Sequence, residues 1–324
     1  MRAMVADSYG PPEVFKLADI PVPTPKDDEV RIKIHAAALN AADWHLLRAD
    51  PFLVRLMFGP FKPKTRVLGA DVAGVVETVG KSVTRFKVGD EVFACLNIFK
   101  LGGFAEKVCA EERYVVLKPS SLSFEEAAAI PLAAITAWQG LRQFGPIEAG
   151  QKVLINGASG GVGTYALQIA KALGAEVTAV CSSRNVEQCR SLGADHVIDY
   201  SRENFTKNGL RYDVIFAANG YHPLKDYQAS LSPTGRYMMS GGAGKQMTAA
   251  ICLGPWYSKG TQQKLGRVDA RANGDDLASI KALIDQGKLK PVIDRRYKLE
   301  ALAQALRYLE EGHAQGKIVI QVQD

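Results

Sequence analysis

The chain has 324 residues, of which 47% are hydrophobic and 23% are charged. This mixture is typical of globular proteins, and it excludes a disordered chain, a collagen and a short disulfide scaffold. The formal net charge of +6 comes from scattered residues, without the block of like charge that marks a nucleic-acid-binding arm, so we expect no nucleic-acid partner. At this length the chain is expected to form about two domains.

Two observations bear on the cellular compartment. No segment approaches the ~20 apolar residues that span a bilayer, and the N-terminus lacks an apolar stretch of signal length. The five cysteines contain no Cys-x-x-Cys pair, which argues against a disulfide framework and against a structural zinc site. We therefore expect a cytoplasmic protein with reduced thiols and no membrane partner.

The first third of the chain is predicted to be rich in β-strands. Short runs of β-branched residues alternate there with turn signals such as residues 79–80 and 88–90. One helix is predicted at residues 41–47, and the proline-interrupted stretch 51–63 is predicted to be a loop. The predicted strands are residues 2–6, 14–17, 30–36, 72–79, 91–94 and 114–117.

The pattern changes near Ser123, which with Glu126 resembles a capping box before an alanine-rich helix at 127–141. After Gly150, strands alternate with helices, which predicts βαβ units and a parallel sheet with helices on both faces. The strands are 152–156, 176–180, 196–199, 213–217 and 236–240, and the helices are 164–173, 186–192 and 224–231. The tail adds helices at 275–286 and 299–311 and a strand at 317–322.

The most informative segment is the strand, turn and helix start at residues 153–163. Ala158, Gly160 and Gly163 fit the A-x-G-x-x-G form of the dinucleotide fingerprint. Gly160 and Gly161 lack bulk and let the backbone approach a pyrophosphate, while Gly163 allows close packing of the helix on the strand. Amides at the helix N-terminus then face the phosphates. The segment predicts a dinucleotide site.

The end of the second strand of this fold favours NADP(H) over NAD(H). A ribose 2′-hydroxyl is normally held there by an acidic residue, whereas a 2′-phosphate requires a cation. This strand is followed by Ser182, Ser183 and Arg184, without an acid. The hydroxyls can donate, and the guanidinium can make a charge-assisted contact to a phosphate. The alternative is that Ser183 caps the next helix and Arg184 points into solvent.

These features resemble the medium-chain dehydrogenase/reductase superfamily, and most closely its zinc-independent quinone oxidoreductase and alkenal/enone reductase branch. The resemblance rests on the glycine turn, residues 182–184, 136–138 and 217–220, and the closing segment 316–319. It implies an α/β fold with a doubly wound Rossmann sheet at 123–271. Residues 1–122 and 272–324 would form a β-rich, chaperonin-10-like (GroES-like) catalytic domain, with a cleft where the domains meet.

The resemblance also implies a set of cofactor contacts. Thr136, Val162 and Gly241 would lie near the nicotinamide, Asn219 and Gly220 along its ribose, and Tyr200 on the adenosine side. Ser182, Ser183 and Arg184 would hold the 2′-phosphate, and Lys317 would point toward the pyrophosphate. The glycine turn would contribute Ala158, Ser159, Gly160 and Gly161. As alternatives, Thr136 is an ordinary helix residue, Tyr200 packs on the sheet, and Lys317 is a solvated charge.

Zinc enzymes of the same superfamily carry a ligand cysteine and a Gly-His-Glu motif, where this chain has Asn40 and Ala70. The resemblance therefore implies a site without metal. An isolated carbonyl would lack a Lewis acid, so a quinone or a conjugated carbonyl is the favoured substrate, because hydride addition gives a delocalised anion. Asn40 is the leading catalytic candidate, with Asp43 and His45 secondary. The alternative is that Asn40 and Asp43 only organise the loop.

The sequence thus predicts an NADPH-dependent, zinc-independent reductase of quinones or α,β-unsaturated carbonyls. Two alternatives stay open: an enoyl-thioester reductase of the same fold, and an NADPH-binding structural or redox-sensing protein with little turnover. Residues 263–270 are expected to form the last strand of the Rossmann sheet, at its edge. Because an exposed edge can pair with a second copy, a homodimer is expected, with Trp256 and Tyr257 close to the interface.

Overall fold

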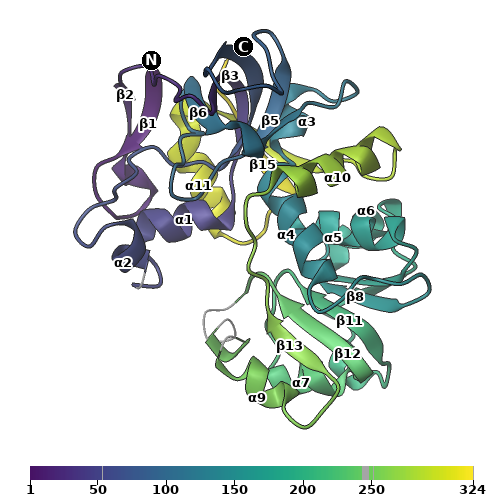
Figure 1. Cartoon of the computed structure of the whole chain (residues 1–324). Coiled ribbons are helices and arrows are strands. Elements are labelled where there is room, and N and C mark those ends of the chain that lie inside the picture. The colour runs from purple at the N-terminus through teal and green to yellow at the C-terminus, as the bar shows by residue number, and fades with distance from the viewer. Residues whose placement is uncertain (53, 243–247, 251, 324) are drawn as a thin grey trace. The chain divides into compact units, whose positions relative to one another are not determined.

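The computed structural model describes residues 1–52, 54–242, 248–250 and 252–323, which divide into two compact units (Figure 1). Unit 1 comprises Met1–Ala133, Arg271–Asp285 and Pro291–Asp324, and unit 2 comprises Ala134–Ala270 and Gln286–Lys290. Unit 1 continues past the predicted boundary at residue 122, because helix α3 (Phe124–Ala128) packs on strands β3 and β4. None of the described helices is both long and apolar enough to cross a bilayer.

Unit 1 contains the β-rich fold that the sequence predicts. Its main sheet has the order β14-β15-β3-β4-β5-β7, with β6 also paired to β3, and β1 and β2 form a separate hairpin. The long strand β3 alternates buried Val30, Ile32 and Ile34 with outward Arg31 and Lys33, as a strand with one face on the core requires. The strands are β1 (Arg2–Ala6), β2 (Phe15–Asp19), β3 (Glu29–Ala38), β4 (Asp71–Val79), β5 (Glu91–Cys95), β6 (Lys107–Glu111), β7 (Val115–Leu117), β14 (Ile293–Lys298) and β15 (Lys317–Gln321).

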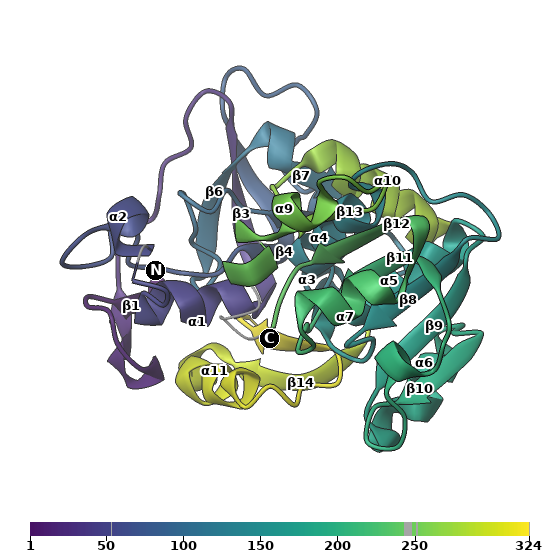
Figure 2. The same cartoon turned by 90° about the horizontal axis from the view of Figure 1, so that it is seen from below.

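The helices of unit 1 pack on this core. They are α1 (Ala41–Arg48), α2 (Val54–Phe58), α3, α10 (Gly274–Asp285) and α11 (Leu302–Glu310). Figure 2 shows α11 beside β14, and its buried face includes Leu302, Ala305 and Leu306. The prediction of a continuous loop at 51–63 is wrong, because Val54 and Phe58 pack against the core and lie on one face of the short helix α2.

Unit 2 is built on a six-stranded parallel sheet with the order β10-β9-β8-β11-β12-β13. Figure 1 shows β8, β11, β12 and β13 side by side. The strands are β8 (Lys152–Asn156), β9 (Glu176–Cys181), β10 (His196–Asp199), β11 (Tyr212–Ala217), β12 (Leu231–Met239) and β13 (Lys264–Arg267). The strand order reverses direction between β8 and β11, which is where doubly wound sheets bind ligands. The predicted doubly wound sheet is confirmed.

The remaining helices are α4 (Pro131–Arg142), which crosses the unit boundary, and α5 (Gly161–Ala172), α6 (Val186–Ser191), α7 (Leu224–Ala229) and α9 (Gly254–Ser258) of unit 2. The helix predicted at 127–141 is two helices, α3 and α4, because Pro131 cannot donate the backbone hydrogen bond that a continuous helix needs. Strands β6 and β14 were not predicted. The apolar run of β6 is only three residues long between Lys107 and Glu111, and charged residues interrupt the apolar pattern of β14.

Candidate functional site

The glycine turn of unit 2 lies at the carboxyl end of β8. A Cβ atom on Gly163 would lie 2.0 Å from the Gly157 carbonyl oxygen, so only glycine fits where α5 leaves the turn. A Cβ atom on Gly160 would meet nothing nearer than the same oxygen, at 3.8 Å. The fold itself therefore requires glycine at 163 and leaves open space beside 160. Such space suits a group that must approach the backbone, as a pyrophosphate does.

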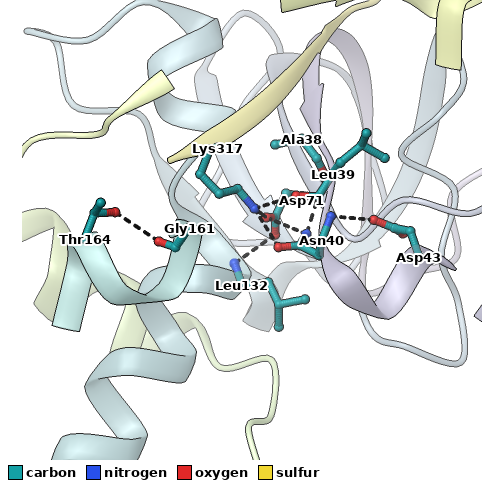
Figure 3. A network of polar contacts seen from close by, with 9 residues as sticks. All are labelled: Ala38, Leu39, Asn40, Asp43, Asp71, Leu132, Gly161, Thr164 and Lys317. Atoms are coloured by element: carbon teal, nitrogen blue, oxygen red, sulfur yellow. Dashed lines mark hydrogen bonds and ion pairs between the residues drawn. The ribbon is translucent and has the colours of Figure 1, made fainter. Parts of the chain in front are cut away.

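The start of helix α5 adds positive character to this turn. Its N-cap residue, Gly160, provides no side-chain hydrogen bond to the first turn. The first amides of a helix have no partner within the helix, and together with the helix dipole they attract anions. Thr164 directs its hydroxyl back to the Gly161 carbonyl oxygen at 3.1 Å, away from these amides (Figure 3).

Buried asparagines connect the turn to the neighbouring loops. Asn156 donates to the Asn219 carbonyl oxygen at 3.0 Å and to the Tyr227 hydroxyl at 2.7 Å, which joins the ends of β8 and β11. Asn185 donates to the Ser159 and Ser182 hydroxyls at 2.9 and 3.1 Å. The Asn185 side chain is buried, and its Oδ1 atom has no hydrogen-bond partner. These hydrogen bonds hold the glycine turn against the segments that follow β9 and β11.

A carboxylate that the sequence prediction missed lies beside the proposed 2′-phosphate site. Asp199, at the end of β10, accepts hydrogen bonds from the Ser183 hydroxyl at 2.5 Å and the Ser201 hydroxyl at 2.7 Å. These hydroxyls, Ser183 first, hold the pKa of Asp199 below its ordinary value. The β9 loop has no acid of its own, but β10 pairs with β9 and brings one to it. The Ser183 hydroxyl is therefore already used as a donor.

The structure brings most of the predicted cofactor residues to one edge of the unit 2 sheet. They follow the carboxyl ends of β8, β9, β10, β11 and β12, namely Ala158, Ser159, Gly160, Gly161, Val162, Ser182, Ser183, Arg184, Tyr200, Asn219, Gly220 and Gly241. Thr136 instead lies in α4 and is half-buried. The contacts predicted for all these residues remain predictions.

The polar candidates of unit 1 meet in a buried network (Figure 3). The Lys317 ammonium group donates to Asn40 Oδ1 at 2.6 Å and the Leu39 carbonyl oxygen at 2.8 Å, and it lies 3.3 Å from Asp71 Oδ2. Only 3% of the Lys317 side chain is exposed. These contacts occupy all three N–H bonds of the ammonium group. The predicted pyrophosphate contact of Lys317 is untested, and it would require the loss of one acceptor.

Two carboxyl groups complete the network. Asp71 accepts from the Asn40 side-chain amide at 2.9 Å and from the Leu132 backbone N–H at 2.8 Å. Asp43 accepts the backbone N–H of Asn40 at 2.7 Å and so fixes the start of α1. Burial raises the pKa values of both carboxyl groups, and the Lys317 ammonium group opposes this. One cation cannot balance two buried carboxylates, so Asp43 titrates near neutrality, with its pKa raised to about 7.

Asp43 should therefore make stability depend on pH. Its carboxyl group binds a proton more tightly in the folded chain, with a pKa of about 7 against the ordinary 3.8. Its contribution to the free energy of unfolding is present below about pH 4 and is lost as the pH rises to about 7. An asparagine at this position does not titrate. As the pH rises from about 4 to about 7, the free energy of unfolding of Asp43→Asn should therefore increase relative to that of the parent by at least about 1 kcal/mol. Denaturant unfolding at both ends of the range measures this change, and a constant difference would contradict it.

His45 lies apart from the network. Its Nδ1 atom is 2.7 Å from the Asp50 carbonyl oxygen, and its ring stacks on Trp44 with the ring centres 3.5 Å apart. A carbonyl oxygen can only accept, so Nδ1 carries the proton and Nε2 is left as an acceptor in the neutral ring. The structure thus brings Asn40 and Asp43 together and leaves His45 as a separate candidate.

Comparison with known proteins identifies the family. Residues 26–120 match the alcohol dehydrogenase GroES-like domain, and residues 192–320 match the zinc-binding dehydrogenase family. The chain is 36% identical to a chloroplast envelope quinone oxidoreductase homolog of Arabidopsis thaliana, over 99% of this chain and 98% of that protein. This chain belongs to the medium-chain dehydrogenase/reductase superfamily.

Two further relatives place this medium-chain reductase in the quinone oxidoreductase branch. An NADPH-dependent alkenal/one oxidoreductase of Arabidopsis thaliana is 36% identical over 99% of this chain and 79% of that protein. The structure of a quinone oxidoreductase from Coxiella burnetii is 30% identical, covers 100% of this chain and 99% of that chain, and has a TM-score of 0.87. The reductase is accordingly an NAD(P)H oxidoreductase. Among its described residues, no three His, Cys, Asp or Glu side chains form a group that could hold a metal ion.

Proposed function

We propose that the protein is an NADPH-dependent, zinc-independent reductase of quinones or α,β-unsaturated carbonyl compounds. The observation that carries this proposal is the open space at Gly160, in front of the uncapped first turn of α5. The alkenal and quinone oxidoreductase names of the relatives support the same substrate classes. A cytoplasmic location and the lack of a nucleic-acid partner are part of this proposal.

The choice of NADPH over NADH rests on Arg184. This residue is exposed and follows Ser183 directly at the end of β9, where a guanidinium can meet a 2′-phosphate. Asp199 acts in the opposite direction, because its carboxylate engages Ser183 and would repel a phosphate. We therefore propose that the preference for NADPH is a balance between Arg184 and Asp199, with Arg184 dominant.

Two charge variants test this balance. Arg184→Glu should weaken NADPH binding by about 1–3 kcal/mol and leave NADH binding nearly unchanged, because only NADPH carries the 2′-phosphate. Asp199→Asn should instead strengthen NADPH binding relative to NADH binding. Calorimetric titration with both nucleotides gives the two affinities. The control is Glu203→Gln, which changes a nearby carboxylate to an amide without touching Ser183. Equal losses of affinity for both nucleotides in Arg184→Glu would refute the assignment.

The chemistry requires little from the protein beyond orientation and one hydrogen-bond donor. The reduced nicotinamide supplies a hydride, which adds to the β-carbon of an enone or to a quinone ring and leaves a delocalised anion on the substrate oxygen. Asn40 is the proposed donor to that oxygen. One of its amide N–H bonds is held by Asp71 at 2.9 Å, whereas the contact to the Ala38 carbonyl oxygen is long, at 3.5 Å. Water can then protonate the carbanion centre.

NADPH oxidation with a panel of acceptors tests the activity. Quinones and enals should support turnover, and a simple ketone should not, because its anion is not delocalised. Faster turnover with enoyl-thioesters would favour the thioester reductase instead. Nucleotide binding without oxidation by any acceptor would favour a structural or redox-sensing role.

We also propose a homodimer through the edge of the unit 2 sheet. Strand β13 pairs only with β12 among the described strands, as the sequence predicts for an edge strand. A two-fold axis beside it would join two sheets into one. Light scattering at micromolar concentration should give the mass of a dimer. A monomer under these conditions would contradict the pairing.

A further inference from the structure

Residues 51–66 of unit 1 carry several exposed apolar and basic side chains. Phe52, Leu56, Met57 and Phe61 are 70%, 70%, 58% and 90% exposed, although side chains of this kind are normally buried. Four large exposed apolar side chains within ten residues of the chain are typical of an interaction site. We call these four residues, with the cations of the same stretch, the α2 surface.

The backbone beneath the α2 surface is fixed. Val54 and Phe58 pack against the core of unit 1, and the Phe58 ring stacks on Phe99 with the ring centres 5.4 Å apart. The Tyr9 hydroxyl donates to the Gly59 carbonyl oxygen at 2.8 Å, and the Lys64 N–H donates to the Phe58 carbonyl oxygen at 2.8 Å. Because the inner face of α2 already packs on the core, Leu56 and Met57 on the rest of this short helix cannot turn into the core.

The charge of this stretch identifies the kind of partner. Residues 51–66 contain Arg55, Lys62, Lys64 and Arg66 and no acidic residue. Lys62 and Lys64 are exposed, whereas Arg66 is paired with Asp7 at 2.6 Å and Arg55 lies over the Tyr9 ring. A second copy of the chain meeting this surface across a two-fold axis would oppose lysine with lysine. The charge therefore favours an anionic partner.

We propose that the α2 surface binds the headgroup region of an anionic lipid bilayer. Leu56 and Met57 lie on the short helix α2, and Phe52 and Phe61 flank it. Exposed apolar side chains with cations beside them are features of segments that lie in a membrane interface. The apolar tips would enter the boundary between headgroups and acyl chains, and Lys62 and Lys64 would contact anionic headgroups. The formal net charge of +6 favours the same encounter. This inference is independent of the proposed activity. The proposal departs from the sequence-based expectation of no membrane partner. That expectation rested on the lack of an apolar segment of spanning or signal length, and a surface contact needs no such segment.

Vesicle co-sedimentation of the full chain tests the proposal. The parent should sediment with vesicles of phosphatidylcholine and phosphatidylglycerol, and much less with phosphatidylcholine alone. The variant Lys62→Glu with Lys64→Glu should bind the anionic vesicles at least about tenfold more weakly, and added salt should weaken the parent. Leu56→Ser with Phe61→Ser should lose binding by a comparable factor.

Matched controls change the same residue types elsewhere. Leu210→Ser removes another exposed apolar side chain, and Lys225→Glu with Lys288→Glu reverses two exposed lysines of unit 2. These variants should keep most of the binding. Thermal unfolding verifies that every variant folds. The proposal is overturned if the parent does not bind anionic vesicles, or if the α2-surface variants bind them as well as the control variants do. It is also overturned if Leu56→Ser with Phe61→Ser instead converts an oligomer into a monomer.

Discussion

Replacement of Lys317 by methionine should lower the free energy of unfolding by about 3–5 kcal/mol, because the change leaves Asp71 buried without its cation. The Lys317 ammonium group is the only cation within the network of Asn40, Asp43 and Asp71 described above. Methionine has a similar length, so the variant removes the charge and three hydrogen bonds with little loss of volume. Denaturant unfolding of the parent and the variant measures the difference.

A matched control separates this effect from the general loss of a lysine. Lys107 in β6 forms an ion pair with Glu77 at 2.7 Å, but both side chains are partly exposed. Lys107→Met should cost less than about 1 kcal/mol, as for other surface pairs. The double variant Lys317→Met with Asp71→Asn should recover part of the stability, because it removes the unpaired charge. A loss in Lys317→Met no larger than that in Lys107→Met would show that the network is not a buried ion pair.

The second large effect concerns two glycines three residues apart. Gly160→Ala should fold normally, since the added carbon has no neighbour closer than 3.8 Å, yet it should weaken NADPH binding at least about tenfold because the carbon occupies the phosphate approach. Gly163→Ala places the same carbon 2.0 Å from the Gly157 carbonyl oxygen, so it should destabilise the fold as well as binding.

Thermal unfolding together with nucleotide titration distinguishes the two glycine variants. The expected pattern is a stable Gly160→Ala protein with NADPH binding weakened at least about tenfold, and a Gly163→Ala protein with a lowered unfolding temperature. Gly209→Ala provides a control, because no atom lies within 4 Å of the added carbon, although its φ of +79° adds some strain. Unchanged NADPH affinity in Gly160→Ala would remove the main support for the proposed site.

The local sequence pattern of alternating strands and helices was sufficient to predict the fold of unit 2. The alternating strands and helices predicted a parallel sheet, and the strands of such a sheet end at one edge, where Ser182 and Gly241 both lie. The choice of Gly241 as a cofactor contact came from the family resemblance, and it stays a prediction. The sequence pattern does not reveal the role of Asp199, because this residue lies at the end of a different strand, β10. Its relevance depends on the pairing of β10 with β9, which brings its carboxylate to Ser183.

The network of unit 1 was harder to predict, because it joins residues far apart in the chain. Lys317 stands in front of three buried apolar residues of β15, and Asp71 stands in front of the buried start of β4. A charged residue at the start of a buried strand indicates a buried partner, but its identity depends on the order β15-β3-β4 in the sheet. The sequence identified Asn40 and Asp43 as polar candidates. It could not show that Lys317 shares their network.

The most direct test of the proposed function follows the hydride. NADPH deuterated on the transferred position of C4 is incubated with the protein and an α,β-unsaturated ketone in ordinary water containing a strong chelator, and the product is analysed by mass spectrometry and NMR. The expected product is a saturated ketone that carries deuterium on the β-carbon and a solvent proton on the α-carbon, formed at a rate that the chelator does not change. Unreacted enone, deuterium on the carbinol carbon of an alcohol, or turnover abolished by the chelator and restored by zinc would contradict it.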